Sequence, residues 1–177
     1  MSILIYFILG LLTSLLFPPY FFLPLGFIIF PFLCFLLESN KENYSDKNIF
    51  NKFSIFGFGF FISYLFWIKN PFFVFEETKN FFLVFLLLII FLSVILGLIF
   101  TIIFKLGKKI PIIILIPLMF TSSEYIISIF FYGFPWFTFS LLLSSNEYLL
   151  FSLKSFGTLF SSYLIIQILC IPFIFLT

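Results

Sequence analysis

Apolar side chains run along this chain in long blocks, separated by short stretches that hold nearly all of the charged residues. A helix needs about 20 predominantly apolar residues to cross the roughly 30 Å hydrocarbon core of a bilayer, and several blocks reach that length. The pattern predicts an all-α integral membrane protein, a single membrane domain over residues 1–177 with a bundle of about six transmembrane helices. The expected spans are residues 3–17, 20–37, 53–68, 81–104, 110–132 and 156–176.

The first apolar block, residues 3–37, is too long to be one span. As a single helix it would measure about 52 Å at 1.5 Å per residue, well beyond the hydrocarbon core. Pro18-Pro19 is the candidate turn, because proline lacks an N–H and disfavours a helical conformation in the residue before it. A cleaved signal peptide is the alternative for residues 1–17, but a basic leading region and a small-residue cleavage site are both missing. We therefore expect an uncleaved span.

The third predicted span, residues 53–68, places Gly59, Ser63 and Trp67 on one helical stripe, at i, i+4 and i+8. Small residues at this spacing let helix backbones approach closely in lipid, and the chain contains no alanine that could share the role. The pattern predicts close helix packing at Gly59.

The fifth predicted span, residues 110–132, carries a single charged residue, Glu124. On insertion scales an acidic residue at the centre of a spanning helix costs roughly 2.5 to 3.5 kcal/mol, so the carboxyl requires a partner or a task. Thr121 and Ser128 share its helical face at i−3 and i+4. Two interpretations stay open: hydrogen bonds through Thr121, Tyr125 or Ser128 that tie helices together, which we favour, and direct contact with a substrate.

A glycine–proline turn follows this span and ends on a tryptophan. Its residues, called here the 133–136 turn, are Gly133, Phe134, Pro135 and Trp136. Tryptophan is typical of positions where a span meets water, and Trp67 closes the third span in the same way. Trp136 is either an ordinary member of the interfacial aromatic belt or part of an entrance for lipid. Residues 137–155 mix apolar and polar side chains and are expected to lie along the membrane surface.

Composition narrows the range of functions. Hydrophobic residues make up 63% of the chain and charged residues only 9%, which excludes a soluble globular domain. The chain has no histidine, and its two cysteines, Cys34 and Cys170, lie within apolar blocks. Zinc sites, disulfide frameworks and histidine-based triads are thereby excluded, and we expect no catalytic residue, metal or cofactor.

The lysines indicate how the chain is oriented in the membrane. The connections at residues 38–52 and 105–109 carry six lysines, whereas residues 69–80 and the last connection carry three. Because positive charge favours the cytoplasmic side, this distribution predicts a cytoplasmic N-terminus and places the 133–136 turn and Trp67 on the outer face. The lysines are dispersed and the net charge is only +2, so nucleic acid is not an expected partner.

Glu124, followed nine positions later by the 133–136 turn, resembles the N-terminal membrane domain of bacterial apolipoprotein N-acyltransferase, in which a glutamate of the fifth span precedes the same tetrapeptide. The Pro18-Pro19 turn and the glycine-rich start of the third span are similar as well. The resemblance implies a multi-pass protein of the bacterial inner membrane that takes part in lipoprotein maturation. Its partners would be a phospholipid, the acyl donor, and a lipoprotein whose N-terminal cysteine amine accepts the acyl chain. Glu124, the 133–136 turn and Trp67 would then serve lipid access.

The chain also departs from the family. The catalytic Glu-Lys-Cys set of the family lies in a nitrilase-like domain after a seventh span, and these 177 residues hold no counterpart of it. We therefore expect an anchor and lipid-access platform that transfers no acyl group alone and works with a separately encoded nitrilase-like domain. Ile127 stands where the family usually has an arginine. A small transporter that uses breaks at Pro117 and Pro172, or a purely structural membrane subunit, remains the alternative.

Overall fold

The computed structural model describes residues 3–39, 41 and 45–175, which form helices and turns and no strand. The α-helices are α1 Ile3–Ser14, α2 Gly26–Glu38, α3 Asp46–Tyr64, α4 Phe82–Leu106, α5 Ile112–Phe130, α6 Glu147–Phe156 and α7 Thr158–Cys170. The 3-10 helices are η1 Leu23–Leu25, η2 Phe66–Phe73, η3 Glu76–Phe81, η4 Phe139–Ser145 and η5 Ile171–Phe175. The prediction of an all-α membrane protein is confirmed.

Three helical stretches are long and apolar enough to cross a membrane: Glu76–Leu106, Ile112–Phe130 and Thr158–Phe175. A fourth arises if α3 and η2, which meet at a bend of 50°, form one span. The apolar helices Ile3–Ser14 and Leu23–Glu38 run beside them but are shorter. The six spans therefore stay a prediction.

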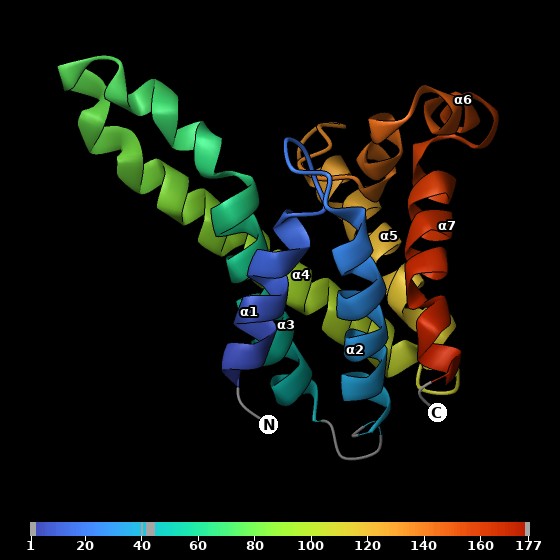
Figure 1. Ribbon diagram of the computed structural model, residues 1–177. Coiled ribbons are helices and arrows are strands. Elements are labelled where there is room, and N and C mark those ends of the chain that lie inside the picture. The colour runs from blue at the N-terminus through green and yellow to red at the C-terminus, as the bar shows by residue number, and fades with distance from the viewer. Residues whose placement is uncertain (1–2, 40, 42–44, 176–177) are drawn as a thin grey trace.

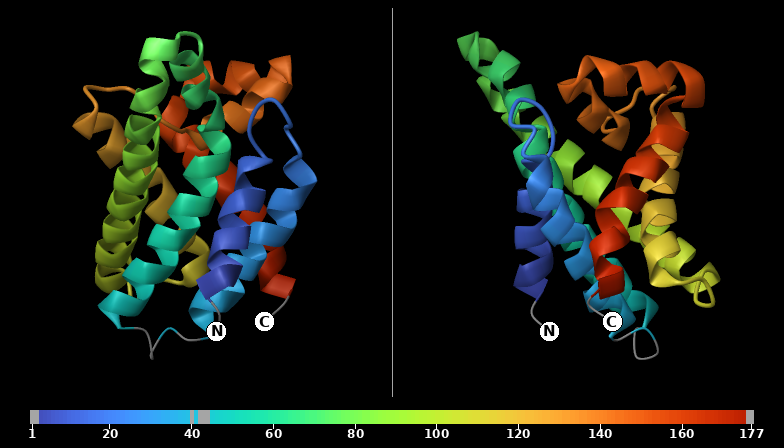
Figure 2. Two further views of the ribbon diagram at one scale, coloured as in Figure 1. Left: turned by 90° about the vertical axis from the view of Figure 1, so that its left-hand side faces the viewer. Right: turned by 45° about the vertical axis from the view of Figure 1, so that its right-hand side comes forward.

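The helices form a bundle with two distinct ends (Figure 1). The two ends of the described chain lie at one end of the bundle, together with the connections from α2 to α3 and from α4 to α5. The opposite end carries the Pro18-Pro19 turn, η2, the 133–136 turn and α6, which lies across the top of α7. There the end of α3, η2, η3 and the start of α4 form an arm that leans away from α5 and α7 (Figure 2).

Helices α1 and α3 pack through their backbones. A Cβ atom added at Gly10 would lie 2.1 Å from the backbone oxygen of Phe56, and one at Gly59 would lie 2.3 Å from that of Phe7. Neither helix could come this close if a side chain stood at either position. The predicted close packing at Gly59 is confirmed. Ser63, the next residue of the predicted stripe, bonds to Ser14 of α1 with 2.8 Å between their hydroxyl oxygens.

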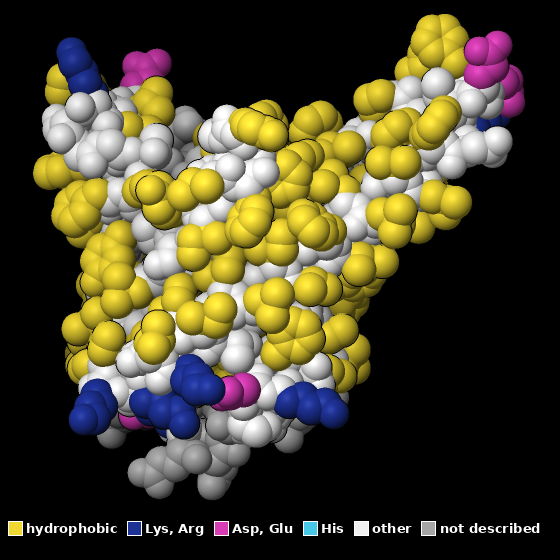
Figure 3. Space-filling model, turned by 180° about the vertical axis from the view of Figure 1, so that it is seen from behind, with side chains coloured by type: hydrophobic (Ala, Val, Ile, Leu, Met, Phe, Trp, Pro, Cys, Tyr) yellow, Lys and Arg dark blue, Asp and Glu magenta, His cyan; other side chains and the backbone are white. Residues whose placement is uncertain are grey.

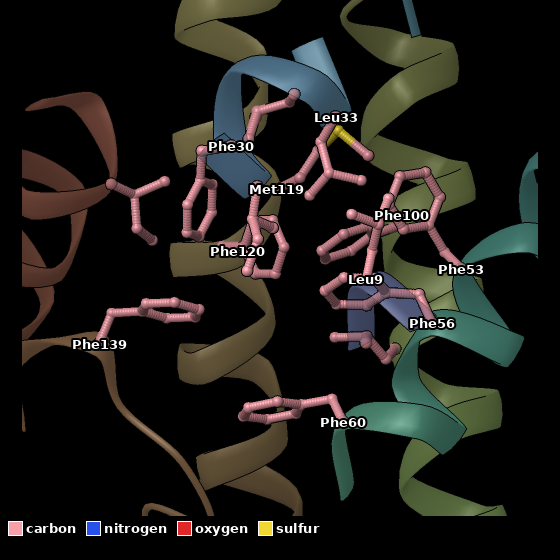
Figure 4. Packing of buried hydrophobic residues seen from close by; sticks show 14 of the residues in the cluster. Leu9, Phe30, Leu33, Phe53, Phe56, Phe60, Phe100, Met119, Phe120 and Phe139 are labelled. Carbon is pink, nitrogen blue, oxygen red and sulfur yellow. The ribbon is translucent and has the colours of Figure 1, made fainter. Parts of the chain in front are cut away.

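Aromatic rings fill the space between the helices (Figure 4). Phe120 of α5 stands at the centre, with its ring edge-on to Phe30 of α2, Phe56 of α3 and Phe100 of α4. The centroid distances are 5.4, 5.8 and 4.9 Å, within the range that favours such pairs. Phe139, at the start of η4, approaches the same ring to 5.3 Å. One core thus joins the first four helices to α5 and η4.

Several predicted boundaries were wrong. Helix α3 begins at Asp46 rather than at residue 53, because the hydroxyl of Ser45 caps it by accepting the N–H of Asn48 at 3.3 Å. The polar residues 46–52, predicted to belong to a loop, are thus the first turns of the helix. The predicted loop at residues 69–80 is largely 3-10 helix. Within residues 137–155, Phe139, Ser140 and Leu142 of η4 are buried inside the protein, and the expected position along the membrane surface stays a prediction. Residues 40, 42–44 and the end of the predicted sixth span, Leu176, lie outside the described residues.

Candidate functional site

Trp67 and Trp136, the two tryptophans of the chain, line the same cavity. This cavity, called here the tryptophan cavity, has a volume of about 300 Å³ and lies between the arm and the 133–136 turn. Its other lining residues are Tyr64, Leu65, Ile68, Pro71, Phe134 and Pro135. The structure thus brings together all the predicted lipid-access residues except Gly133, which shapes the turn, and Glu124, which lies below it.

The 133–136 turn is shaped by two residues in the left-handed region of backbone conformation. Tyr132 has φ of 55° and Gly133 has φ of 87°. The N–H of Gly133 donates to the carbonyl of Ser128 at 2.7 Å, so the chain reverses directly at the end of α5. A Cβ atom at Gly133 would meet nothing within 4 Å, so glycine is needed there for its φ and not for space.

Trp136 is partly buried against the rings of Phe131 and Phe134, with centroid distances of 5.1 and 5.0 Å. Both pairs are edge-on, which fixes the plane of the indole. The indole nitrogen is buried and has no hydrogen-bond partner among the described residues. Trp136 is therefore a fixed wall of the cavity with one N–H donor still free.

The opposite wall comes from the bend between α3 and η2. Tyr64 is the last residue of α3, and Trp67, which is 63% exposed, lies on η2 beyond the 50° bend. A second cavity of about 560 Å³ lies on the other side of the same bend, against the Pro18-Pro19 turn. Tyr64 and Trp67 line both cavities, so they stand between them.

An apolar hollow of about 590 Å³ continues from the turn along α4. Its lining residues are Val84, Leu87, Leu88, Ile90, Phe91, Val94 and Phe131. The ring of Phe131 connects it to the tryptophan cavity, since it contacts Phe91 at 6.2 Å and Trp136 at 5.1 Å. Figure 3 shows this face of the molecule, with hydrophobic side chains across the surface between the arm and the rest of the bundle.

Glu124 lies in α5 and is only 4% exposed. Its carboxylate accepts the backbone N–H of Phe139 at 2.8 Å and the hydroxyl of Thr138 at 3.0 Å. The hydroxyl of Thr138 lies 3.1 Å from that of Ser162 in α7, and the hydroxyl of Ser162 accepts the N–H of Ser140 at 2.9 Å. We call these five residues the Glu124 network. It joins α5, η4 and α7.

The predicted hydrogen-bond partners of Glu124 were wrong. Ser128 donates to the carbonyl of Tyr125 at 2.8 Å, Tyr125 is 53% exposed, and the hydroxyl of Thr121 is buried without a partner among the described residues. Helical periodicity points only to neighbours on the same helix, whereas the actual partners follow the 133–136 turn. A signal for these partners was present in the sequence, since the polar residues Thr138 and Ser140 stand on either side of Phe139 just beyond the turn.

The lining of the tryptophan cavity is largely apolar. Its lining is aromatic and aliphatic, and within the described ranges no three histidine, cysteine or acidic residues come together in a way that could hold a metal ion. Cys34 and Cys170 are fully buried in α2 and α7 and do not line the tryptophan cavity. A buried thiol without a neighbouring base is a poor nucleophile.

Comparison with known proteins identifies the family. The family model described as the apolipoprotein N-acyltransferase N-terminal domain matches residues 9–171. No curated protein and no solved structure matches the chain. The matched range includes Trp67, Glu124, the 133–136 turn and the partners of Glu124 in η4 and α7.

Proposed function

The chain belongs to the apolipoprotein N-acyltransferase family, whose N-terminal domain it matches over residues 9–171, and we propose that it is the anchor and lipid-access platform of such an enzyme. The reaction it serves is transfer of an acyl chain from a phospholipid to the amine of a lipoprotein's N-terminal cysteine. The observation that supports this role is the tryptophan cavity, which Trp67 and Trp136 both line between the arm and the 133–136 turn.

The size and lining of the cavities suit a lipid. Ligand sites commonly enclose about 300 to 1,000 Å³ and are mostly apolar with a few polar groups. The tryptophan cavity and the hollow along α4 have this size, and the hollow is apolar over the length of an acyl chain segment.

The two ends of the bundle support a membrane orientation. Six lysines lie in or beside the connections at the end where the described chain begins and finishes, and the tryptophan cavity lies at the other end (Figures 1 and 3). We infer a cytoplasmic N-terminus in a bacterial inner membrane, with the cavity at the outer face. A reporter that fluoresces only in the cytoplasm, fused after the last residue, should be bright, and activity of a periplasm-dependent reporter there would contradict this orientation.

The acyl-transfer chemistry would come from a nitrilase-like domain. Covalent acyl transfer needs an activated nucleophile, a base and oxyanion donors, and the outer end of the bundle offers no such set among the residues described. The test mixes the purified chain with phospholipid and a diacylglyceryl-cysteine peptide, with and without a purified nitrilase-like domain from the same genome. We expect acylated peptide only in the complete mixture.

Variants of the two tryptophans test whether the tryptophan cavity contributes to acyl transfer. Replacing Trp136 or Trp67 by alanine should lower the rate of the complete mixture about tenfold, as for truncation of an aromatic contact to a bound ligand, whereas Tyr148→Ala should not. Tyr148 is 90% exposed on α6, at the same end but outside the cavity. A phospholipid with a photoactivatable group in its acyl chain should label residues 64–71 and 131–136. Product or a cysteine thioester from the chain alone would contradict the platform role, and an inactive mixture without labelling would favour a structural subunit.

A further inference from the structure

Two hydrogen bonds of Glu124 go to one short piece of chain, two to three residues beyond Trp136. The carboxylate accepts from the Thr138 hydroxyl and from the Phe139 N–H, and it is 4% exposed. Hydrogen bonds formed away from water are electrostatically stronger than those at a surface, and breaking one leaves a buried donor unsatisfied. The piece of chain that leaves the 133–136 turn is therefore fastened to α5, the helix that enters it.

The Phe139 N–H needs an acceptor from elsewhere. Phe139 is the first residue of η4, and the first N–H groups of a helix have no partner within that helix. Thr138 occupies the position before η4, but its own side chain makes no capping hydrogen bond. Glu124 supplies the missing acceptor from a different helix, so the place where η4 begins is set by α5.

Ser162 fastens the next residue to α7. Its hydroxyl accepts the N–H of Ser140 at 2.9 Å and lies 3.1 Å from the hydroxyl of Thr138. Ser162 and Ser140 are both buried, with 0% and 2% exposure. Residues 138–140 are thus held from both sides, by α5 and by α7.

The phenylalanine rings on either side of Thr138 link the position of residues 138–140 to the neighbouring helices. Phe137 packs edge-on against Phe61 of α3 at 5.5 Å, and Phe139 packs edge-on against Phe120 of α5 at 5.3 Å. Trp136 directly precedes Phe137 in the chain and lines the tryptophan cavity. A displacement of residues 138–139 would therefore move the wall that Trp136 forms.

We propose that Glu124 is a positioning residue, which fixes the 133–136 turn and the Trp136 wall of the tryptophan cavity by holding residues 138–139. That this wall serves lipid access rests on the proposed function, but the position of Trp136 can be measured without a bound lipid. Because Glu124 acts through hydrogen bonds, an amide should replace it. The carbonyl of a glutamine accepts the Phe139 N–H, and its NH₂ donates to Thr138, whose hydroxyl then donates to Ser140 or Ser162.

The experiment uses the full chain in vesicles of phosphatidylethanolamine and phosphatidylglycerol, in a Trp67→Phe background that leaves Trp136 as the one tryptophan, which is excited selectively over tyrosine. Glu124→Leu and Thr138→Val remove hydrogen bonds, and Glu124→Gln and Thr138→Ser keep them. Ser128→Ala is the control, since the side chain of Ser128 bonds only within α5. We expect the first two to shift the Trp136 emission maximum and to raise its acrylamide quenching constant about twofold, because a buried donor or acceptor is left unpaired. The other three should match the parent.

Unchanged Trp136 fluorescence in Thr138→Val would overturn the proposal even if Glu124→Leu fails to accumulate, because the valine variant keeps the carboxylate. Glu124→Gln behaving like Glu124→Leu would also overturn it, because charge rather than hydrogen bonding would then be responsible. Helix content from circular dichroism, equal among the variants, confines the change to the turn. Failure of the photoactivatable phospholipid to label the cavity contradicts the proposed function and leaves this result unaffected.

Discussion

Helices α1 and α3 pack with their backbones in direct contact, whereas α5 and α7 are joined by hydrogen bonds among the buried carboxylate of Glu124 and the hydroxyls of Thr138, Ser140 and Ser162. In the first region Gly10 and Gly59 remove the side chains that would hold the helices apart. In the second, the Glu124 network connects two helices that do not touch as closely, and it includes residues 138–140, where the 3-10 helix η4 begins. Both contacts are buried inside the bundle, where water competes for neither kind.

The difference has a functional meaning. Close backbone packing fixes two straight helices but cannot hold an irregular segment, whose N–H groups need acceptors that a bilayer does not provide. The Glu124 network supplies such acceptors next to the tryptophan cavity, and the glycine contacts lie deeper between α1 and α3. The four predictions below test this division, from the largest expected effect to the smallest.

Glu124→Lys should abolish accumulation of the chain in the membrane. Lysine cannot accept the Phe139 N–H or the Thr138 hydroxyl, and it brings an unpaired positive charge to a buried position. The amount of chain in isolated membranes, measured by immunoblot, should fall at least about tenfold, as expected for an uncompensated buried charge. Ser128→Lys is the control, because that side chain lies near the end of α5 and can reach water. Equal amounts of the two lysine variants would show that Glu124 faces a water-filled space.

Gly10→Ala should strongly destabilise the α1–α3 contact. The added methyl would lie 2.1 Å from the Phe56 carbonyl oxygen, so backbone must move, which we expect to cost about 3 kcal/mol by analogy with overpacked cores. Gly26→Ala is the matched control, because its methyl would meet the flexible Leu169 side chain, whose methyl groups can turn away. Thermal unfolding in detergent should separate the two variants clearly. Similar melting temperatures would mean that α1 and α3 are not in backbone contact.

Gly133→Ala should cost about 1 kcal/mol, because an L-residue at φ of 87° is strained while space for the methyl is available. Gly157→Ala, at φ of 73° in the turn before α7, should cost a similar amount. Only the first variant should change Trp136 fluorescence, since only that turn carries the cavity wall. A Trp136 signal that responds equally to both would show that the turn does not set the indole position.

Asp46→Asn should leave stability almost unchanged. The carboxylate of Asp46 accepts a hydrogen bond from the Lys105 ammonium at 2.8 Å, which joins the start of α3 to the end of α4. Both side chains are more than half exposed, so water and salt screen the pair. Melting temperatures in low and high salt should agree with those of the parent. A large loss would mean that this end of the α3–α4 pair depends on charge rather than on the packing of α3 on α4.

The sequence predicted the fold class, the 133–136 turn and the close packing at Gly59, because each depends on a local pattern. The length of the apolar blocks indicates a membrane protein, and Gly133 and Pro135 mark the turn. The four-residue spacing of small side chains marks the face on which α3 packs. Hydropathy misplaced the start of α3, since the capping signal at Ser45 and Asp46 lies in a polar stretch that resembles a loop.

The contacts of the site could not be predicted in the same way. Thr138 lies fourteen residues beyond Glu124 and on another element, so no helical spacing relates them. Trp67 and Trp136 were each recognised as interfacial residues, but only the 50° bend after Tyr64 and the reversal at Gly133 bring them to one cavity. Such pairs depend on tertiary geometry, which a single sequence does not encode in its periodicity.

The unequal lengths of the helices have a consequence for the surrounding lipids. Helix α1 has 12 residues and is about 18 Å long, whereas α4 has 25 residues and is about 38 Å long. If α1 crosses the bilayer as predicted, no bilayer of uniform thickness matches both helices, so either the leaflets thin beside α1 or α4 tilts, at a fraction of a kcal/mol per Å of mismatch. In the first case, the lipids beside α1 are elastically deformed where they border the Pro18-Pro19 turn. Lifting one of their tails out of the bilayer there takes less work than it would from a flat membrane.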